Sequence, residues 1–152
     1  MSVVARLEEH AFRPDHELAT LTECASGDGA IVSFIGVARP GSKCGQAVYR
    51  LALEHHPALT LQSLEEIAAE AAARFDVSHV HVVHRSGEIA AGEPIVFAGA
   101  ASRHRRAAFE AVDYLMDRLK TEAVFWKREI GEAGSEWIEP TQADYSDRER
   151  WG

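Results

Sequence analysis

Two lysines that lie seven residues apart, Lys120 and Lys127, enclose an apolar run at 124–126 that includes two aromatic rings. A solvated charged stretch does not need the apolar side chains, and an ordinary core segment does not need the two amines. Two ammonium groups held close together disfavour each other's charge, and a neutral lysine is a nucleophile or a general base. The spacing therefore predicts a reactive lysine pair. The simpler explanation is that a lysine near a helix C-terminus only complements the macrodipole.

A helix expected over 103–121, followed by a strand over 124–130, would position this pair. The helix carries an apolar stripe at helical spacing, which consists of Phe109, Val112, Met116 and Leu119, extended by Ala108 and Leu115. Lys120 lies at the margin of that stripe, where its stem can pack while the amine reaches a pocket edge. In the strand, Lys127 shares a face with Phe125, whereas Trp126 and Arg128 point the other way. The turn between the two elements would bring both amines to one cleft.

A cationic cluster at 103–106 lies at the other end of the same helix, beside its free backbone N–H groups. Such a helix start is an anion site suited to phosphate, although a solvated basic turn is the alternative. Basic residues there oppose the helix dipole, and local conflicts of this kind favour a functional explanation. Arg39, which follows an apolar strand and opens a Gly/Pro loop, is a further candidate anion contact, although taken alone it is more typical of a surface arginine.

The histidines give a weaker signal. One expected strand carries His79, His81 and His84, and another segment carries the adjacent pair His55 and His56. An H-x-H pair on a strand without a matched third ligand is weak evidence for a metal site. A strand face that is solvated or covered by a helix is therefore favoured. No G-x-S-x-G, P-loop, G-x-G-x-x-G or H-E-x-x-H motif occurs. Common hydrolase and nucleotide-binding mechanisms are therefore not supported.

Composition limits the class of protein further. A net charge of −8 argues against a broad nucleic-acid surface, but a local cationic pocket remains compatible with an anionic substrate. No apolar run is long enough to span a bilayer, and the N-terminus lacks the pattern of a secretory signal. Cys24 and Cys44 stand twenty residues apart without a C-x-x-C motif, which fits free thiols in a reducing compartment. We expect a cytoplasmic protein that binds neither membrane nor nucleic acid.

Short strands and three helices are expected to form the scaffold. Strands are expected at 2–9, 30–37, 47–55, 77–85, 94–101, 124–130 and 135–139, and helices at 16–25, 61–75 and 103–121. Asp15, Thr60 and Ser102 are the predicted N-caps. The strand at 30–37 is expected to be buried and to form a hairpin with 47–55, and the strand at 77–85 is expected to have two unlike faces.

These elements do not alternate regularly enough for a doubly wound sheet. We therefore predict an α+β fold with a mainly antiparallel sheet. A single domain at 1–140 is expected, followed by a polar tail at 141–152 that is either mobile or docked on a partner.

Several blocks of the sequence carry a family resemblance: "GAIVSFIGVAR" (29–39), "LALEHHP" (51–57), "VVHRSGEIAAGEPIV" (82–96), "SRHRRAAFEAVDYLMDRLKTEAVFWKRE" (102–129) and "EWIE" (136–139). Together they resemble the large, catalytic subunit of molybdopterin synthase, the MoaE family. The resemblance implies an α/β hammerhead fold, a single catalytic domain at 1–140 and a homodimer within a heterotetramer. It also implies a small ubiquitin-like carrier subunit at each end, whose C-terminal Gly-Gly thiocarboxylate gives two sulfurs to cyclic pyranopterin monophosphate. The product is the molybdopterin dithiolene, and no metal or other cofactor is expected.

The resemblance also assigns residues. Lys120 and Lys127 match the catalytic lysines, and the expected substrate-binding residues are Arg39, His104, Arg105, Arg128, Val37, Ala38 and Glu129. The pocket wall is expected to consist of Phe34, Met116 and Phe125. The cyclic phosphate suits Arg39, His104 and Arg105, of which the last two are expected to come from the neighbouring subunit. The chain departs from the family pattern at Val124, His56 and Pro40, and the loop 40–46 differs slightly in length.

Two other functions are compatible with a lysine-containing apolar pocket. One is a Schiff-base enzyme that acts on a phosphorylated carbonyl substrate. The other is a non-catalytic docking module for a ubiquitin-like protein. The motif at 102–129 favours the synthase over both.

Overall fold

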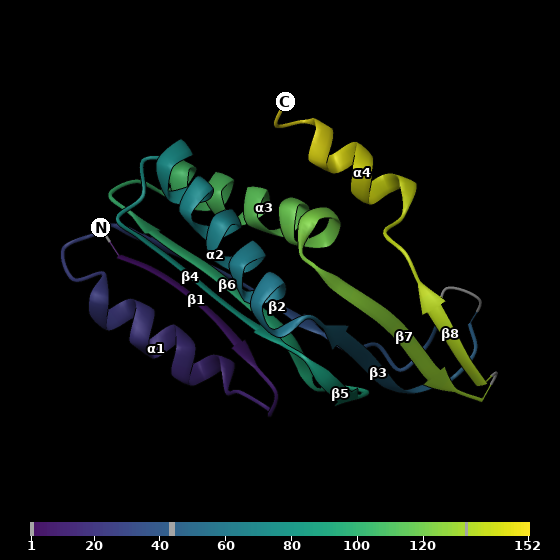
Figure 1. Ribbon diagram of the computed structural model, residues 1–152. Coiled ribbons are helices and arrows are strands. Elements are labelled where there is room, and N and C mark those ends of the chain that lie inside the picture. Colours follow the sequence, from purple (N-terminus) through teal and green to yellow (C-terminus); the bar gives the residue numbers. More distant parts are fainter. Residues whose placement is uncertain (1, 43–44, 133) are drawn as a thin grey trace.

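The computed structural model describes residues 2–42, 45–132 and 134–152, and within them the chain forms eight strands and four helices (Figure 1). The strands are β1 (Ser2–Glu8), β2 (Ala30–Val37), β3 (Val48–His55), β4 (His79–Arg85), β5 (Gly87–Ala90), β6 (Pro94–Ser102), β7 (Phe125–Gly131) and β8 (Gly134–Ile138). The helices are α1 (Pro14–Cys24), α2 (Pro57–Arg74), α3 (Arg105–Glu122) and α4 (Gln142–Glu149). The predicted α+β class is confirmed. The predicted number of three helices is wrong, because the tail forms a fourth.

The first sheet has the order β1-β4-β6-β2, with β1 and β4 parallel and the other pairs antiparallel. Figure 1 shows α2 and α3 on one face of this sheet and α1 on the other. Val82 and Val83, neighbours on β4 that point to opposite faces, are both fully buried as a result. The two faces are nevertheless unlike, as predicted, because Val80 and Val82 pack in the apolar core whereas His81 contacts Glu17 of α1.

A network of polar contacts fastens α1 to the first sheet. Glu17 of α1 accepts hydrogen bonds of 2.7 and 3.0 Å from the guanidinium of Arg6 on β1. Its Oε1 atom also lies 2.9 Å from Nε2 of His81 on β4. The Glu17 side chain is only 10 % exposed, so its charge is tolerated because it is paired and hydrogen-bonded. The face of β4 that carries His81 is thus covered by α1 and is not solvated.

The second sheet has the order β5-β3-β7-β8 and is antiparallel throughout. The predicted hairpin between β2 and β3 is wrong, because β2 pairs with β6 in the first sheet and β3 pairs with β5 and β7. Tight hairpins use loops of two to five residues, and the longer connection here leaves pairing to tertiary packing. Part of the Gly/Pro loop at 39–46, residues 43–44, lies outside the described residues.

The edge strand β2 is more exposed than predicted. Phe34, Ile35 and Val37 have 41 %, 43 % and 47 % of their surface exposed, so the expectation of a buried strand is wrong. The position of β2 at the end of the first sheet explains this result, since only one of its edges is paired within the described chain.

The three predicted N-caps are also wrong. The N-cap positions are occupied instead by Arg13, His56 and His104. Proline is favoured in the first turn of a helix, and it starts both α1 and α2 earlier than the polar residue chosen from the sequence. Thr60 lies inside α2, where its hydroxyl donates a 2.6 Å hydrogen bond to the carbonyl of Val124. Ser102 ends β6 and donates to the carbonyl of Asp76.

Helix α3 packs in a slightly different orientation from the predicted one. Its buried residues are Ala108, Ala111, Val112, Tyr114, Leu115 and Leu119. Phe109, placed in the stripe by its hydrophobicity, is 58 % exposed. Leu115 is fully buried against the first sheet, where such a side chain contributes about 1.5–3 kcal/mol.

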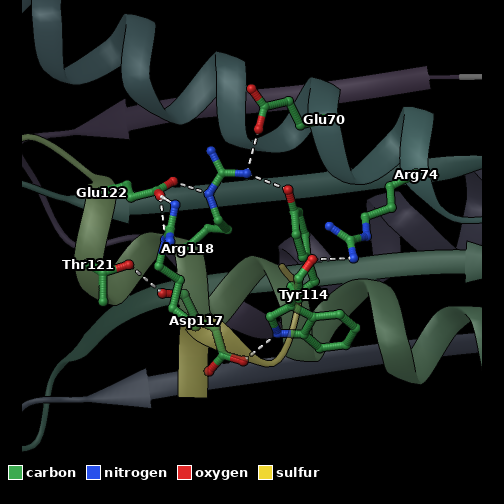
Figure 2. Close-up of polar contacts among 9 residues, drawn as sticks. Glu70, Arg74, Tyr114, Asp117, Arg118, Thr121 and Glu122 are labelled. Carbon is green, nitrogen blue, oxygen red and sulfur yellow. Dashed lines mark hydrogen bonds and ion pairs between the residues drawn. The ribbon is translucent and has the colours of Figure 1, made fainter. Parts of the chain in front are cut away.

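The tail docks on its own chain as α4. Thr141 and Asp144 form a capping box at its start, with hydrogen bonds of 2.8 and 3.1 Å. Trp151, just after α4, packs edge-to-face on Phe75 and Tyr114. Figure 2 shows the neighbouring polar network on α3, in which Arg118 contacts Glu70, Tyr114 and Glu122. The mobile alternative for this segment is therefore not what the structure shows.

Candidate active site

A cavity of about 530 Å³ lies where the end of α3, strand β7 and the C-terminal segment meet. Its charged lining consists of Arg39, Lys120, Lys127, Glu129, Glu139 and Asp144. Apolar side chains form much of the remaining wall, among them Val37, Leu51, Ile95, Leu119 and Phe125. Concave sites of this size, apolar with a few convergent polar groups, are typical of small-molecule binding.

The junction between α3 and β7 brings the two lysines together. Lys120 lies in the last turn of α3, and β7 begins after only two intervening residues. This turn is held to α2 at two points: the Val124 carbonyl accepts from Thr60, and the Val124 amide donates to the hydroxyl of Ser63 at 3.2 Å. Val124 therefore serves as an anchored hinge between two lysine-bearing elements, which explains why an apolar run separates the amines.

The alternation of β7 divides the motif between two faces. Phe125, Lys127 and Glu129 line the cavity, as the strand pattern predicts. Trp126 is 53 % exposed on the opposite face. Arg128 lies there too, with its guanidinium 5.6 Å from the ring of Trp137 and 3.9 Å from a carboxylate oxygen of Glu54.

The sequence-based prediction missed His84, which also lines the cavity. Its ring stacks on Phe125, with 4.2 Å between centroids and 24° between planes. Burial chiefly, and then the charges of Lys127 and Lys120, outweigh the opposing effect of a hydrogen bond to the Arg85 carbonyl and together lower the pKa of His84 to about 4. The sequence alone indicates His84 only as a candidate metal ligand, and its place in the block 82–96 that carries the family resemblance is the one signal that could have linked it to the site.

The C-terminal segment supplies a wall that the sequence did not predict. Thr141, Asp144 and Tyr145 face the cavity from the start of α4. Burial alone would raise the pKa of Asp144, but hydrogen bonds from Thr141 and the charges of Lys120 and Lys127 outweigh it and lower the pKa below its ordinary value. Asp144 is thus an ionised counter-charge for the lysine pair.

The other predicted site residues are distributed as follows. Arg39 and Val37 line the cavity, while Ala38 is buried behind it in a small apolar cluster with Leu53 and Ile89. Phe34 and Met116 are not part of the cavity lining. His104 and Arg105 lie at the exposed start of α3. Fifteen residues of helix separate Arg105 from Lys120, or about 22 Å along the axis, so one chain does not bring these groups together.

Neither a metal site nor a membrane span is evident in the part of the chain that the structure describes. No three His, Cys, Asp or Glu side chains among those residues are grouped so that they could hold a metal ion. None of the described helices has the length and apolar character needed to cross a membrane. Cys24 is an exposed free thiol, and Cys44 lies outside the described residues.

The fold and the cavity together define an α+β protein whose pocket places two lysines and an arginine beside apolar walls, an arrangement suited to an anionic small molecule. The profile of the family described as "MoaE protein" matches residues 7–122, and the chain belongs to that family.

Relatives support this assignment over almost the whole chain. The molybdopterin synthase catalytic subunit of Caulobacter vibrioides is 44 % identical over 98 % of this chain and 97 % of its own length. The corresponding subunit of Pseudomonas aeruginosa is 42 % identical over 96 % of this chain and 97 % of its own length. The solved MoaE protein from Burkholderia ambifaria superimposes with a TM-score of 0.82 at 35 % identity, covering 100 % of this chain and 99 % of that one.

Proposed function

We propose that this chain is the catalytic subunit of a molybdopterin synthase. In this proposal it transfers sulfur from the thiocarboxylated C-terminus of a small ubiquitin-like carrier to cyclic pyranopterin monophosphate, in the cytoplasm. The relatives that it matches along nearly their full length carry the name of that subunit. The observation that carries the proposal is that Lys120 and Lys127, from separate elements, line one cavity with Arg39.

The chemistry needs cations and a proton donor. Both the thiocarboxylate and the phosphate ester are anionic, so the negative charge of each must be compensated by a nearby cation before the sulfur can approach the carbon atom. An ammonium group stabilises the thiocarboxylate, and it can give a proton to the phosphate oxygen as the cyclic ester opens. We assign the more essential role to Lys120. Lys127 positions the substrate or the carrier tail, and Arg39 binds the phosphate.

A second copy of the chain would complete the site. His104 and Arg105 are exposed at the end of α3 remote from the lysines. One turn of α3 after Arg105, Phe109 exposes its apolar ring, and β2, which packs against α3, exposes that of Phe34. Exposed apolar surface of this kind is typical of protein interfaces. We propose a homodimer in which this surface is covered and the His104–Arg105 pair reaches the partner's cavity, with one carrier bound to each copy.

The test combines the purified chain, the cyclic pterin precursor and a thiocarboxylated carrier, and measures the dithiolene product as an oxidised fluorescent pterin. Product that depends on both the carrier and Lys120 supports the proposal. Carrier binding without product would instead favour the non-catalytic docking module. Borohydride trapping of a covalent adduct with a phosphorylated carbonyl compound would favour the Schiff-base enzyme.

A further inference from the structure

His84 of β4 lines the cavity together with Lys120 of α3 and Lys127 of β7, and its ring is hydrogen-bonded to the backbone carbonyl of Arg85. Its side chain is only 6 % exposed, and the part that reaches the surface faces the cavity lined by Lys120 and Lys127. Its ring is held flat against Phe125, which shares the cavity face of β7 with Lys127. The imidazole therefore has little rotational freedom and one open side.

The hydrogen bond of the ring decides which of its two nitrogens carries the proton in the neutral form. His84 Nδ1 lies 2.8 Å from the backbone carbonyl oxygen of Arg85. A carbonyl oxygen can only accept, so Nδ1 carries the proton and donates it. In the neutral ring, Nε2 then carries no proton, and its lone pair makes it a hydrogen-bond acceptor.

Burial, together with the lysine charges of the cavity, keeps this ring neutral. The cations that line the same cavity are Arg39, Lys120 and Lys127, and the carboxylates are Glu129, Glu139 and Asp144. Burial has the largest effect on the pKa of His84, and the charges of Lys127 and then Lys120 act in the same direction, so the pKa falls to about 4. At neutral pH the ring is an uncharged acceptor beside two ammonium donors.

We propose that His84 is a positioning residue for the lysine pair, with Nε2 accepting a hydrogen bond from the ammonium group of Lys127. Lys127 is the partner favoured by the fold, because it follows Phe125 by two residues on the same strand face. A lysine side chain loses considerable rotamer entropy when it is held in one conformation, and a rigid acceptor compensates for part of that loss. This role rests on the proposed function, since it concerns the lysines of the sulfur-transfer site.

Three variants separate the acceptor from the packing. His84→Phe keeps the stack on Phe125 and removes both nitrogens. His84→Asn keeps a donor near the Nδ1 position for the Arg85 carbonyl but has no acceptor that reaches the cavity. His84→Gln places an amide near the Nε2 position and restores an acceptor. We expect kcat/KM for dithiolene formation to fall about 10-fold to 100-fold in the first two and to recover most of that loss in His84→Gln.

The decisive readout is coupling to Lys127. If His84 acts through that lysine, adding His84→Asn to Lys127→Ala causes little further loss, whereas independent roles give multiplied losses. In ¹⁵N NMR spectra of the wild-type ring we expect a protonated Nδ1 and an unprotonated Nε2 that titrates near pH 4. The Nε2 resonance should move in Lys127→Ala.

Multiplied losses, a proton on Nε2 at neutral pH, or an Nε2 resonance that moves in Lys120→Ala but not in Lys127→Ala would each overturn the proposal. The NMR experiment does not depend on turnover. A wild-type protein that makes no product would therefore refute the synthase function while the contact between His84 and Lys127 is still tested.

Discussion

Trp151 holds α4 against α3, and its replacement by Ala should release that helix while the rest of the chain stays folded. The ring packs on Phe75 and Tyr114 with centroids 5.7 and 5.5 Å apart, and Nε1 donates a 2.7 Å hydrogen bond to Asp117. Each aromatic pair contributes about 0.5–1.5 kcal/mol, and a hydrogen bond to a charged acceptor about 1.5–3 kcal/mol. Because Trp151 is partly exposed, we use the lower ends of these ranges for the two aromatic pairs and the hydrogen bond, and expect a loss of about 2.5 kcal/mol in docking free energy.

A loss of that size increases the undocked population of α4 roughly 60-fold. Hydrogen exchange should report it directly, as faster exchange of the amides of α4 with unchanged protection in β4 and β6. Glu149→Ala is the matched control: Glu149 lies on an exposed position of the same helix, and its replacement should change stability by no more than about 0.5 kcal/mol. Wild-type exchange rates for α4 in Trp151→Ala would refute the assignment of Trp151 as the anchor.

Two further predictions concern charge. Lys127→Ala should lower kcat/KM about 10-fold to 100-fold, since it removes one charge-assisted contact, whereas Arg50→Ala should leave turnover normal because the 3.1 Å pair of Arg50 with Glu88 lies on the exposed surface. Equal turnover in the two variants would exclude Lys127 from the site. Burial would raise the pKa of Glu17, but hydrogen bonds from Arg6 and His81 lower it overall. The stabilisation from ionised Glu17 is thus fully present above the ordinary pKa of 4.5 and is lost as the pH falls through the lower folded-state value. We therefore expect the stabilities of the wild type and of Glu17→Gln, measured by acid unfolding with circular dichroism, to start converging as the pH falls below 4.5 and to meet below the lower folded-state pKa. A constant difference down to low pH would contradict this assignment.

The local part of the fold was predictable because it depends on local patterns. The periods of the apolar residues located β1, β2, β7, β8 and α3 to within a few residues. The strand alternation predicted that Lys127 and Arg128 point to opposite faces of β7, and the structure confirms it, since this alternation depends only on the pleat of the strand. The placement of both lysines on one cavity followed from the short turn between helix and strand.

The features that could not be predicted depend on contacts between residues that lie far apart in the sequence. The partner of β2 is β6, more than fifty residues away along the chain, and the exposure of Phe109 reflects which side of α3 meets the sheet. His84 was overlooked because its importance comes from its stacking on Phe125 and from its neighbours on α3 and β7. The docking of α4 depends on Trp151, one of two aromatic residues in an otherwise mostly polar tail.

The central claim is that Lys120, on the cavity between α3 and β7, carries out the transfer of sulfur to the pterin. The most direct test is single-turnover formation of the dithiolene by the purified chain with the thiocarboxylated carrier, comparing the wild type, Lys120→Ala and Arg50→Ala at equal carrier occupancy. We predict product with the wild type and Arg50→Ala, and a loss of at least about 100-fold with Lys120→Ala, which is the scale found when a charge-stabilising group of an active site is removed. Near-normal product from Lys120→Ala with the carrier bound would contradict the account.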